Sequence, residues 1–327
     1  MKAVVTGGTG FIGSYLVEQL VQNKYQVCCI AKDEMNAADL KTLEVEIIQG
    51  DINNGISWKP ILKNTDYIFH LAGVTRAIRS SDYFEGNFIT TRRILQRSLK
   101  LCQNLNRFIY VSSLAAVGPA HSEIPLTEET VYHPVSTYGK SKMLAELEVL
   151  KRKDKLPFTI LRPSAVYGPR DRDMLKYIAL IQKRIQPLIG FRKKWLNLIH
   201  RDDLVNGIIQ AAVSPQGENE IFFLGSEKNY TTEQIGDIIA RVIQKSRIKF
   251  PLPEWLVYLV GGMAELAGKM SGKDVFFNRQ KVSEAVQTYW TCSIEKAKNL
   301  LDFKESYALQ DGLRQTYEWY MTQDWLS

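Results

Sequence analysis

The feature that most constrains the fold is a glycine-rich turn close to the start of the chain. Residues 6–13 read TGGTGFIG, between an apolar run of strand length at 2–5 and an amphipathic stretch of helix length at 11–22. Glycines allow a tight turn and close backbone approach, and the unpaired N–H groups at the start of a helix attract an anion. The sequence therefore predicts a strand–turn–helix unit that binds phosphate. The residues expected around that phosphate are Gly7, Gly10, Phe11, Ile12 and Gly13.

Strand-length apolar runs alternate with helix-length amphipathic stretches through the first two thirds of the chain. The runs are rich in β-branched residues, so we expect an α/β fold: a Rossmann-type doubly wound parallel sheet with helices on both faces. The predicted strands are 2–5, 25–30, 45–49, 67–72, 107–112 and 158–162. The predicted helices between them are 11–22, 84–102 and 136–150.

The pattern changes after about residue 165. Predicted helices at 173–184, 202–213 and 231–243 are separated by short strands near 196–199 and 220–224. We expect a nucleotide-binding domain over 1–165 and a smaller α/β substrate-binding lobe over 166–327. No linker separates the two, so we expect their segments to be interleaved.

The composition is that of an ordinary globular protein, with 45% hydrophobic and 24% charged residues. None of the four cysteines forms a Cys-x-x-Cys pair, and the four histidines have no ligand spacing, so we expect no metal site and no disulfide framework. His70 and His200 are expected to have packing roles. Asp202 and Asp203 are expected to cap the helix that they open.

Net charge is +7, from 42 basic and 35 acidic residues. The excess is concentrated at 151–153, 183–184 and 192–194, which we interpret as solvated surface. An anionic substrate or peripheral contact with an anionic membrane surface is the alternative. Zinc spacing and RNA-binding aromatic signatures are missing from the sequence, so we expect no nucleic-acid partner.

The location of the protein is predicted from two further segments. Met1 leads directly into the first apolar run, without the basic and apolar leader of a signal peptide. The longest apolar stretch, 255–268, contains Glu265 and is shorter than a membrane span of about 20 residues. We therefore expect a cytoplasmic protein.

Two residues in the predicted helix 136–150 have the spacing of a catalytic pair. Tyr138 and Lys142 are four positions apart, which places them on one face of a helix. An ammonium about 4 Å from a phenol is worth roughly 4 kcal/mol, or about three pKa units, which would bring the phenol toward neutral pH. A hydroxyl is expected at the end of the fifth strand, where Ser112 and Ser113 lie.

Several segments, taken together, resemble the extended short-chain dehydrogenases/reductases. They are the glycine turn, GDI (50–52), HLAG (70–73), Asn87, LRPSAVYGP (161–169) and IHRDDL (199–204). They follow the family's order and cover residues 1 to about 245. The resemblance selects Ser113 as the catalytic hydroxyl. Ser112 points the other way on a strand and would serve as a backbone cap.

The resemblance implies an NAD(P)-binding Rossmann domain and a set of site residues. The catalytic residues would be Ser113, Tyr138 and Lys142. The cofactor-binding residues would be Gly7, Gly10, Phe11, Ile12, Gly13, Lys32, Asp51, Ile52, Leu71, Ala72, Gly73, Tyr138, Lys142 and Pro163. The substrate would contact Ser113, Ser164, Val166 and Leu196. The resemblance also implies a homodimer formed through helices 84–102 and 136–150.

The cofactor type depends on the end of the second strand. NAD-preferring relatives usually carry an acid there, whereas this chain has Ala31 followed by Lys32. A missing acid beside a cation favours the extra phosphate of NADP over NAD. Asp33 and Glu34 follow at once, and a slip of one or two residues would reverse the preference.

The substrate class is predicted from residues that depart from the family's sugar-nucleotide members. Leu114 and Ala115 stand where dehydratases carry an Asp–Glu pair, so a dehydratase is not expected. Leu196 stands where many epimerases carry a diphosphate-binding Arg, although Lys193 and Lys194 could compensate. The apolar segment 251–272 would form a lid over an apolar substrate.

The favoured function is therefore an NAD(P)-dependent oxidoreductase that acts on an apolar secondary alcohol or ketone. It would be similar to 3β-hydroxysteroid dehydrogenases, and 312–326 resembles members of that type and hopanoid-associated members. A nucleotide-sugar epimerase is the first alternative. A non-catalytic dinucleotide-binding regulator is the second, and the intact Ser113, Tyr138 and Lys142 argue against it.

Overall fold

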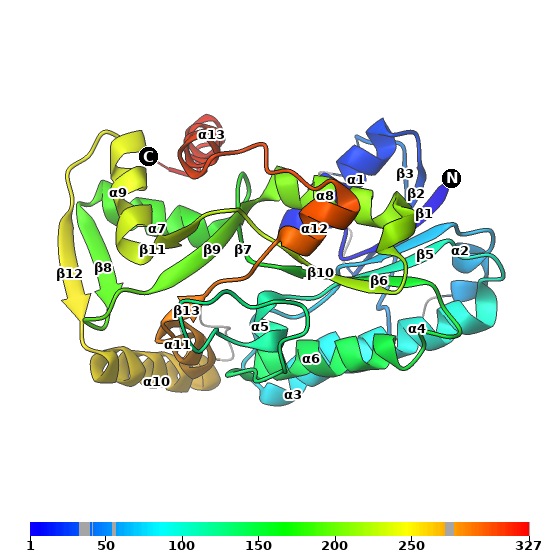
Figure 1. The fold of residues 1–327 in the computed structure, drawn as a ribbon, viewed down its shortest axis with the longest axis horizontal. Helices are drawn as coiled ribbons and strands as arrows, with labels where there is room; N and C mark the ends of the chain where they lie inside the picture. The colour runs from blue at the N-terminus through cyan, green and yellow to red at the C-terminus, as the bar shows by residue number, and fades with distance from the viewer. Residues whose placement is uncertain (33–39, 41, 54–56, 272–277, 327) are drawn as a thin grey trace.

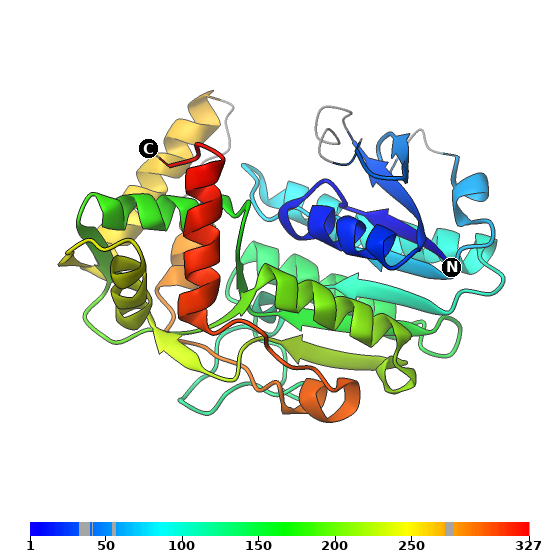
Figure 2. The same cartoon turned by 90° about the horizontal axis from the view of Figure 1, so that it is seen from above.

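The computed structural model describes residues 1–32, 40, 42–53, 57–271 and 278–326. It has two parts that lie side by side (Figures 1 and 2). A wide sheet with helices on both faces forms one part. A smaller group of helices and short strands forms the other. Its helix α13 (Leu309–Thr322) stands beside the large sheet in Figure 2.

The large sheet has seven strands in the order β10-β6-β5-β4-β1-β2-β3, and every pair is parallel. The strand order reverses between β1 and β4, and the carboxyl ends of the strands at such a point form the ligand crevice of α/β sheets. The strands are β1 (Lys2–Thr6), β2 (Gln26–Ala31), β3 (Val45–Gln49), β4 (Tyr67–His70), β5 (Arg107–Val111), β6 (Phe158–Pro163) and β10 (Glu220–Leu224).

Each face of the sheet is covered by helices. Neighbouring strand residues point to opposite faces, so Val5 packs into one apolar core and Val4 into the other. One core is completed by α1 (Phe11–Gln22), α8 (Arg201–Val213) and α12 (Glu295–Leu301). The other is completed by α2 (Trp58–Leu62), α4 (Thr90–Leu101) and α6 (Thr137–Leu150). Burial on both faces explains why the central strands β4 and β5 are buried at every residue.

The second part contains two small sheets and its own apolar core. β7 (Ala165–Tyr167), β11 (Asn229–Thr231) and β13 (Tyr289–Trp290) pair around β9 (Trp195–His200). β8 (Ile185–Ile189) pairs with β12 (Ile248–Leu252). The core lies among α7 (Arg172–Gln182), α9 (Thr232–Val242) and α13. The remaining elements are α3 (Ser80–Tyr83), α5 (Leu114–Val117), η3 (Pro215–Gly217), α10 (Glu254–Ser271) and α11 (Arg279–Ala285).

The predicted α/β class, with a doubly wound parallel sheet, is confirmed. The chain after residue 166 returns to the large sheet, because β10 pairs with β6 and α8 covers one face. The functional division at 165 stays a prediction. Among the described residues, no helix is long and apolar enough to cross a membrane.

One predicted helix differs from the structure. The stretch 84–102 is interrupted at its start by a π-helical segment, η2 (Phe84–Ile89), between α3 and α4. Asn87 lies in this segment, and its side chain donates to the carbonyl of Val74 (2.9 Å) and accepts from the Val74 amide (2.7 Å). It also donates to Ser141 Oγ on α6 at 2.8 Å. The wider π-helical turn thus places the Asn87 side-chain amide between the loop after β4 and helix α6, and its hydrogen bonds connect the two.

Candidate active site

A single cavity runs from the glycine turn, past the carboxyl ends of the strands, into the second part of the molecule. It brings together most of the residues that the sequence selected. Those that line it are Gly7, Gly10, Phe11, Ile12, Gly13, Leu71, Gly73, Ser113, Tyr138, Lys142, Pro163, Ser164, Val166 and Leu196. The other four selected residues, Lys32, Asp51, Ile52 and Ala72, are not part of this lining.

The glycine turn has the geometry that a pyrophosphate needs. Gly7 has a φ of +76°, and a Cβ there would lie 2.6 Å from the Ala72 amide nitrogen. A Cβ at Gly13 would lie 2.1 Å from the carbonyl oxygen of Gly7. α1 begins at Phe11, and its N-cap Gly10 offers no side-chain cap. The N–H groups of the first turn are therefore left for an anion, and the chain fits a dinucleotide there.

Three of the four selected residues outside the lining follow the ends of strands β2 and β3. Lys32 is exposed at the end of β2. Asp51 is exposed and accepts from the amide of Asn53 at 2.8 Å, and the carbonyl of Ile52 accepts from Arg97 at 2.6 Å. Asp33 and Glu34, on which the NADP argument also depends, lie outside the described residues.

Ser113 and Tyr138 meet at the centre of the cavity. Ser113 is the N-cap of α5, where its Oγ accepts from the amide of Ala115 at 3.1 Å. Its side chain is also hydrogen-bonded to the Tyr138 hydroxyl. The cap role that we expected for Ser112 thus belongs to Ser113. Ser112 is buried and instead donates to Glu146, because it faces the helices that cover the other side of the strand.

Lys142 is hydrogen-bonded to the end of β5. Its Nζ donates to the carbonyl of Val111 at 2.7 Å and lies 4.6 Å from the centre of the Tyr110 ring. Burial lowers the pKa of Lys142 to about 7. Burial also raises the pKa of Tyr138, and the cation that opposes this rise is Lys281. The catalytic pairing of Lys142 with Tyr138 stays a prediction.

Lys281 is a functional candidate that sequence reasoning missed. It lies on α11, lines the cavity, and its Nζ is 5.9 Å from the centre of the Tyr138 ring. Glu284, one turn further, is 3.1 Å from Lys281 Nζ and accepts from Ser136 Oγ at 2.6 Å. Gln280 accepts from the amide of Thr137 at 2.6 Å. α11 is thus attached to the first turn of the helix that carries Tyr138.

A buried ion pair supports the same helix from behind. Glu146 lies one turn after Lys142, and its Oε2 is 2.8 Å from Arg162 NH2 on β6. Both side chains are at most 1% exposed. Tyr132 donates to the same carboxylate at 2.7 Å. Glu146 continues the four-residue spacing of Tyr138 and Lys142, and that spacing was the one sequence signal that pointed to it.

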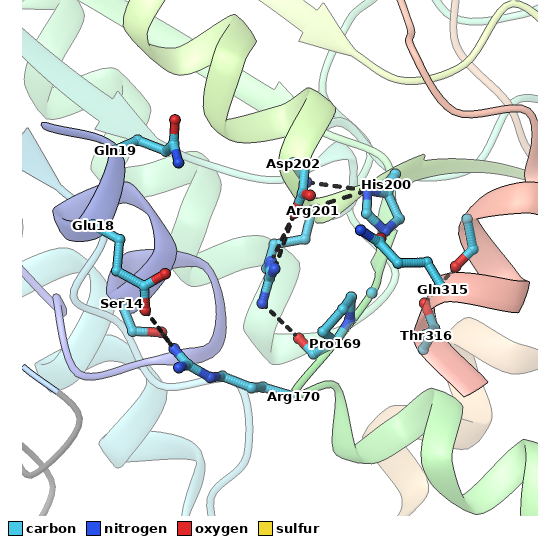
Figure 3. Close-up of polar contacts among 12 residues, drawn as sticks. Ser14, Glu18, Gln19, Pro169, Arg170, His200, Arg201, Asp202, Gln315 and Thr316 are labelled. Atoms are coloured by element: carbon cyan, nitrogen blue, oxygen red, sulfur yellow. Dashed lines mark hydrogen bonds and ion pairs between the residues drawn. The ribbon is translucent and has the colours of Figure 1, made fainter. Parts of the chain in front are cut away.

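Polar contacts connect the glycine-turn helix to the loop after β7 (Figure 3). Arg170 donates to Ser14 Oγ and to Glu18 Oε1 on α1, each at 3.0 Å. Arg201 donates to the carbonyl of Pro169 at 2.9 Å and to Asp202 at 3.0 Å. These contacts hold the phosphate end of the cavity against the second part of the molecule.

We expected Asp202 and Asp203 to cap α8, and this prediction is wrong. The N-cap is His200, whose Nδ1 accepts from the amide of Asp202 at 3.3 Å. Asp202 instead pairs with Arg201, because the two side chains are neighbours on the first turn. Asp203 accepts from the amides of Ser306 (2.9 Å) and Tyr307 (3.1 Å) and so fixes the chain before α13.

His70 and His200 are buried and stay neutral. His70 lies between Thr6 Oγ1 (2.7 Å) and Thr91 Oγ1 (2.8 Å), and burial lowers its pKa to about 3. Burial lowers the pKa of His200 to about 4. Neither histidine lines the cavity. Among the described residues, no group of three or more His, Cys, Asp or Glu side chains could hold a metal ion.

The end of the cavity beyond Tyr138 is mainly apolar. Leu196 on β9 is half-buried there, and Ser164 is buried with a hydroxyl that has no partner. The further apolar residues that line this end are Leu180, Pro187, Ile189, Leu198, Leu252, Leu256, Val257, Val260 and Trp290. α10, the described part of the expected lid, supplies three of them. An unpaired hydroxyl among apolar walls suits one polar atom on an apolar substrate.

The sequence profile of the NAD dependent epimerase/dehydratase family matches residues 3–225. The chain belongs to this family. The resemblance to extended short-chain dehydrogenases/reductases is therefore confirmed. Members are NAD-dependent epimerases, dehydratases and reductases, so the chain is an enzyme of this kind and the non-catalytic alternative is not supported.

Individual relatives are distant but cover nearly the whole chain. The UDP-glucose 4-epimerase of Vibrio cholerae is 26% identical and covers 96% of this chain and 93% of its own. The ceramide reductase of Caulobacter vibrioides is 25% identical, with 98% and 95% covered. The crystal structure of the Bacillus cereus UDP-glucuronic acid 4-epimerase with UDP-glucuronic acid and NAD is 24% identical, with a TM-score of 0.79 and 99% and 100% covered.

Proposed function

We propose that the enzyme transfers hydride between NAD and a secondary alcohol or ketone on a substrate with a large apolar body. The observation that carries this proposal is the apolar cavity end around Leu196. A diphosphate bound there would lose its water without gaining a charged partner from β9, which is costly. An alkyl or ring system would gain from burial against the same walls.

The side chains around Tyr138 supply the proton chemistry. Bound NAD would accept hydride from the alcohol carbon or return it to the ketone carbon. In reduction Tyr138 donates its proton to the ketone oxygen, and Ser113 donates a hydrogen bond to the same oxygen. In oxidation Tyr138 accepts the proton. Lys142 lies where it can hold the sugar next to the nicotinamide, as the family resemblance implies.

We propose NAD as the working cofactor. The predicted preference for NADP is not supported, because the solved relatives are described with NAD. Lys32 is exposed and lies outside the cavity lining. The ratio of kcat/KM values for NADH and NADPH tests this choice.

A nucleotide-sugar epimerase is the second candidate. The relatives and solved structures named above favour it over the 3β-hydroxysteroid dehydrogenase-like interpretation, because several of them are UDP-sugar epimerases. Several cationic side chains also line the cavity wall, where a diphosphate could approach them. They are Arg76, Lys142, Arg170, Arg172, Lys176, Lys194 and Lys281. In this candidate the oxidation and reduction occur on one sugar carbon, with no net change in NAD.

An assay with both substrate classes distinguishes the two candidates. The enzyme is mixed with NADH and long-chain or polycyclic ketones, and separately with NAD and either UDP-glucose or UDP-glucuronic acid. Ketone-dependent loss of NADH absorbance supports the oxidoreductase, and formation of a sugar epimer without net formation of NADH supports the epimerase. Leu196→Arg should weaken ketone turnover by tenfold or more in the first case. If Leu196→Arg leaves ketone turnover unchanged, the apolar end is not the substrate site.

We further propose that the enzyme works in the cytoplasm as a homodimer formed through the faces of α4 and α6. The family resemblance supports the dimer. Analytical ultracentrifugation of the purified chain measures the oligomer directly.

A further inference from the structure

One side of α10 presents a continuous apolar row to solvent. Trp255 is 67% exposed, Leu259 52%, Met263 59%, Leu266 61% and Met270 82%. Their spacing follows the helical repeat, so they lie along one side of α10. Single exposed apolar residues are ordinary, but a row of large ones marks a surface that binds something. We call these five residues the α10 row.

The apolar surface continues from the α10 row onto neighbouring segments. Tyr258 lines a shallow hollow with Trp255, Leu259, Arg279 and Ser283. Phe191, in the turn between β8 and β9, is 82% exposed. This turn meets the first residue of α10, because a Cβ at Gly190 would lie 2.7 Å from Glu254 Oε1. In Figure 1 the turn and α10 form the lower left edge of the molecule.

The charges around this surface are positive. Arg192 and Lys193 follow Phe191 in the same turn and are exposed, as is Arg279 beside the hollow. The nearest acid at the start of α10, Glu254, is paired with Lys194 at 3.1 Å. Glu265 is half-buried and is not a member of the row. Large apolar side chains, with Trp and Tyr among them, are thus bordered by exposed cations.

We propose that α10 and the turn at 191–193 bind the surface of an anionic lipid membrane. The helix would lie in the plane of the head groups, with the α10 row among the upper acyl chains and the cations against lipid phosphates. Trp and Tyr favour this depth. A second copy of the chain would bring Arg192, Lys193 and Arg279 toward a surface of the same sign, whereas anionic lipid complements them.

The inner side of α10 connects this surface with the cavity. Leu256, Val257 and Val260 line the cavity from the same helix whose outer row faces solvent. A membrane bound at the row would therefore lie next to the apolar end of the cavity. An apolar substrate could then pass from lipid to the site without crossing water. This last step alone rests on the proposed function.

Vesicle binding by the full chain tests the proposal. The purified protein is sedimented with vesicles of phosphatidylcholine alone and with vesicles that also contain phosphatidylglycerol. We expect binding to the anionic vesicles that weakens as salt rises. We also expect a blue shift in tryptophan fluorescence that is lost in Trp255→Phe. Leu259→Glu should weaken binding at least tenfold, and so should Arg192→Glu combined with Lys193→Glu.

A matched control keeps the test independent of folding and of enzyme activity. Val213, at the end of α8, is 49% exposed and lies outside the row, so Val213→Glu should bind vesicles as the unchanged chain does. Equal binding to neutral and anionic vesicles would overturn the proposal. So would no binding at all, or a dimer that dissociates in Leu259→Glu while vesicles are ignored. The assay contains no substrate, so its result is separate from that of the ketone assay.

Discussion

The Tyr138 hydroxyl is protonated in the free enzyme. Its side chain is half-buried, and desolvation raises its pKa, while the charge of Lys281 and the hydrogen bond with Ser113 oppose the rise. A protonated phenol beside the cavity is ready to donate to a ketone oxygen.

Tyr138→Phe should remove most turnover and leave cofactor binding intact. The change deletes one hydroxyl and keeps the ring that packs in the cavity wall, so we expect kcat to fall by about 10² to 10⁴. NADH affinity, measured by fluorescence titration, should change less than threefold. A variant with kcat close to that of the unchanged enzyme would remove Tyr138 from the proton path.

Lys142 makes stability depend on pH. Its pKa is about 7 in the folded chain and 10.5 in the unfolded chain, so between these values the unfolded chain binds more protons. The free energy of unfolding contributed by this group therefore rises with pH from 7 to 10.5. Below pH 7 both states are protonated, and the burial penalty is present in full.

Lys142→Met should remove this pH dependence. The variant should gain stability relative to the unchanged chain at pH 6.5, and less of that gain should remain at pH 9.5. Urea unfolding at the two pH values measures the difference. Lys151→Met is the control, because the Lys151 side chain is 68% exposed. Equal effects of Lys142→Met at both pH values would show that the lysine is not desolvated.

The residues of the site were predictable from the sequence where local spacing or a motif fixes them. Tyr138 and Lys142 share one helix, so their four-residue spacing places them together. Lys281 comes to the same cavity from α11, through contacts with Ser136 and Thr137 that no spacing reveals. The spacing therefore identified Tyr138 and Lys142 from the sequence. Lys281, which reaches the cavity through tertiary contacts, was missed.

At the scale of elements, α11 and α6 act as one unit around the phenol. Glu284 raises the pKa of Tyr138, and it also holds Lys281, whose charge lowers that pKa. Glu284→Gln keeps the shape and the means to accept from Ser136 but removes the negative charge. The pKa of Tyr138 should therefore fall.

The pH profile of ketone reduction reports this change. Reduction needs protonated Tyr138, so activity falls as pH rises through the pKa, and in Glu284→Gln that fall should occur at lower pH. Glu295→Gln serves as the control because the Glu295 side chain is 67% exposed. A profile of kcat/KM that does not move in Glu284→Gln would mean that α11 acts on the site only by packing.

Elements were predictable where burial shapes the sequence. The apolar strand run at 107–112 matches β5 closely, because every residue of this strand is buried. The π-helical segment η2 was not predictable. It arises from hydrogen bonds between Asn87 and Val74, in a loop that periodicity does not describe.

At the scale of the whole molecule, residues before and after position 165 share one apolar core on the large sheet. Leu204, Ile208 and Phe222, all beyond residue 165, are fully buried against strands and helix α1 of the first part. β10 also supplies the hydrogen-bonded neighbour of β6. Apolar packing thus continues across the predicted domain boundary at 165.

A fragment of residues 1–165 should therefore not fold stably. Without α8, α12 and β10, it exposes one apolar face of the sheet and leaves β6 as an open edge, which favours aggregation. Circular dichroism and sedimentation of the fragment should show no cooperative thermal transition or an aggregate. The full chain should unfold in one calorimetric transition, because residues on both sides of position 165 build the core of the large sheet. A soluble fragment with a sharp transition would show that the nucleotide-binding part holds its sheet without the strand and helices returned by the second part.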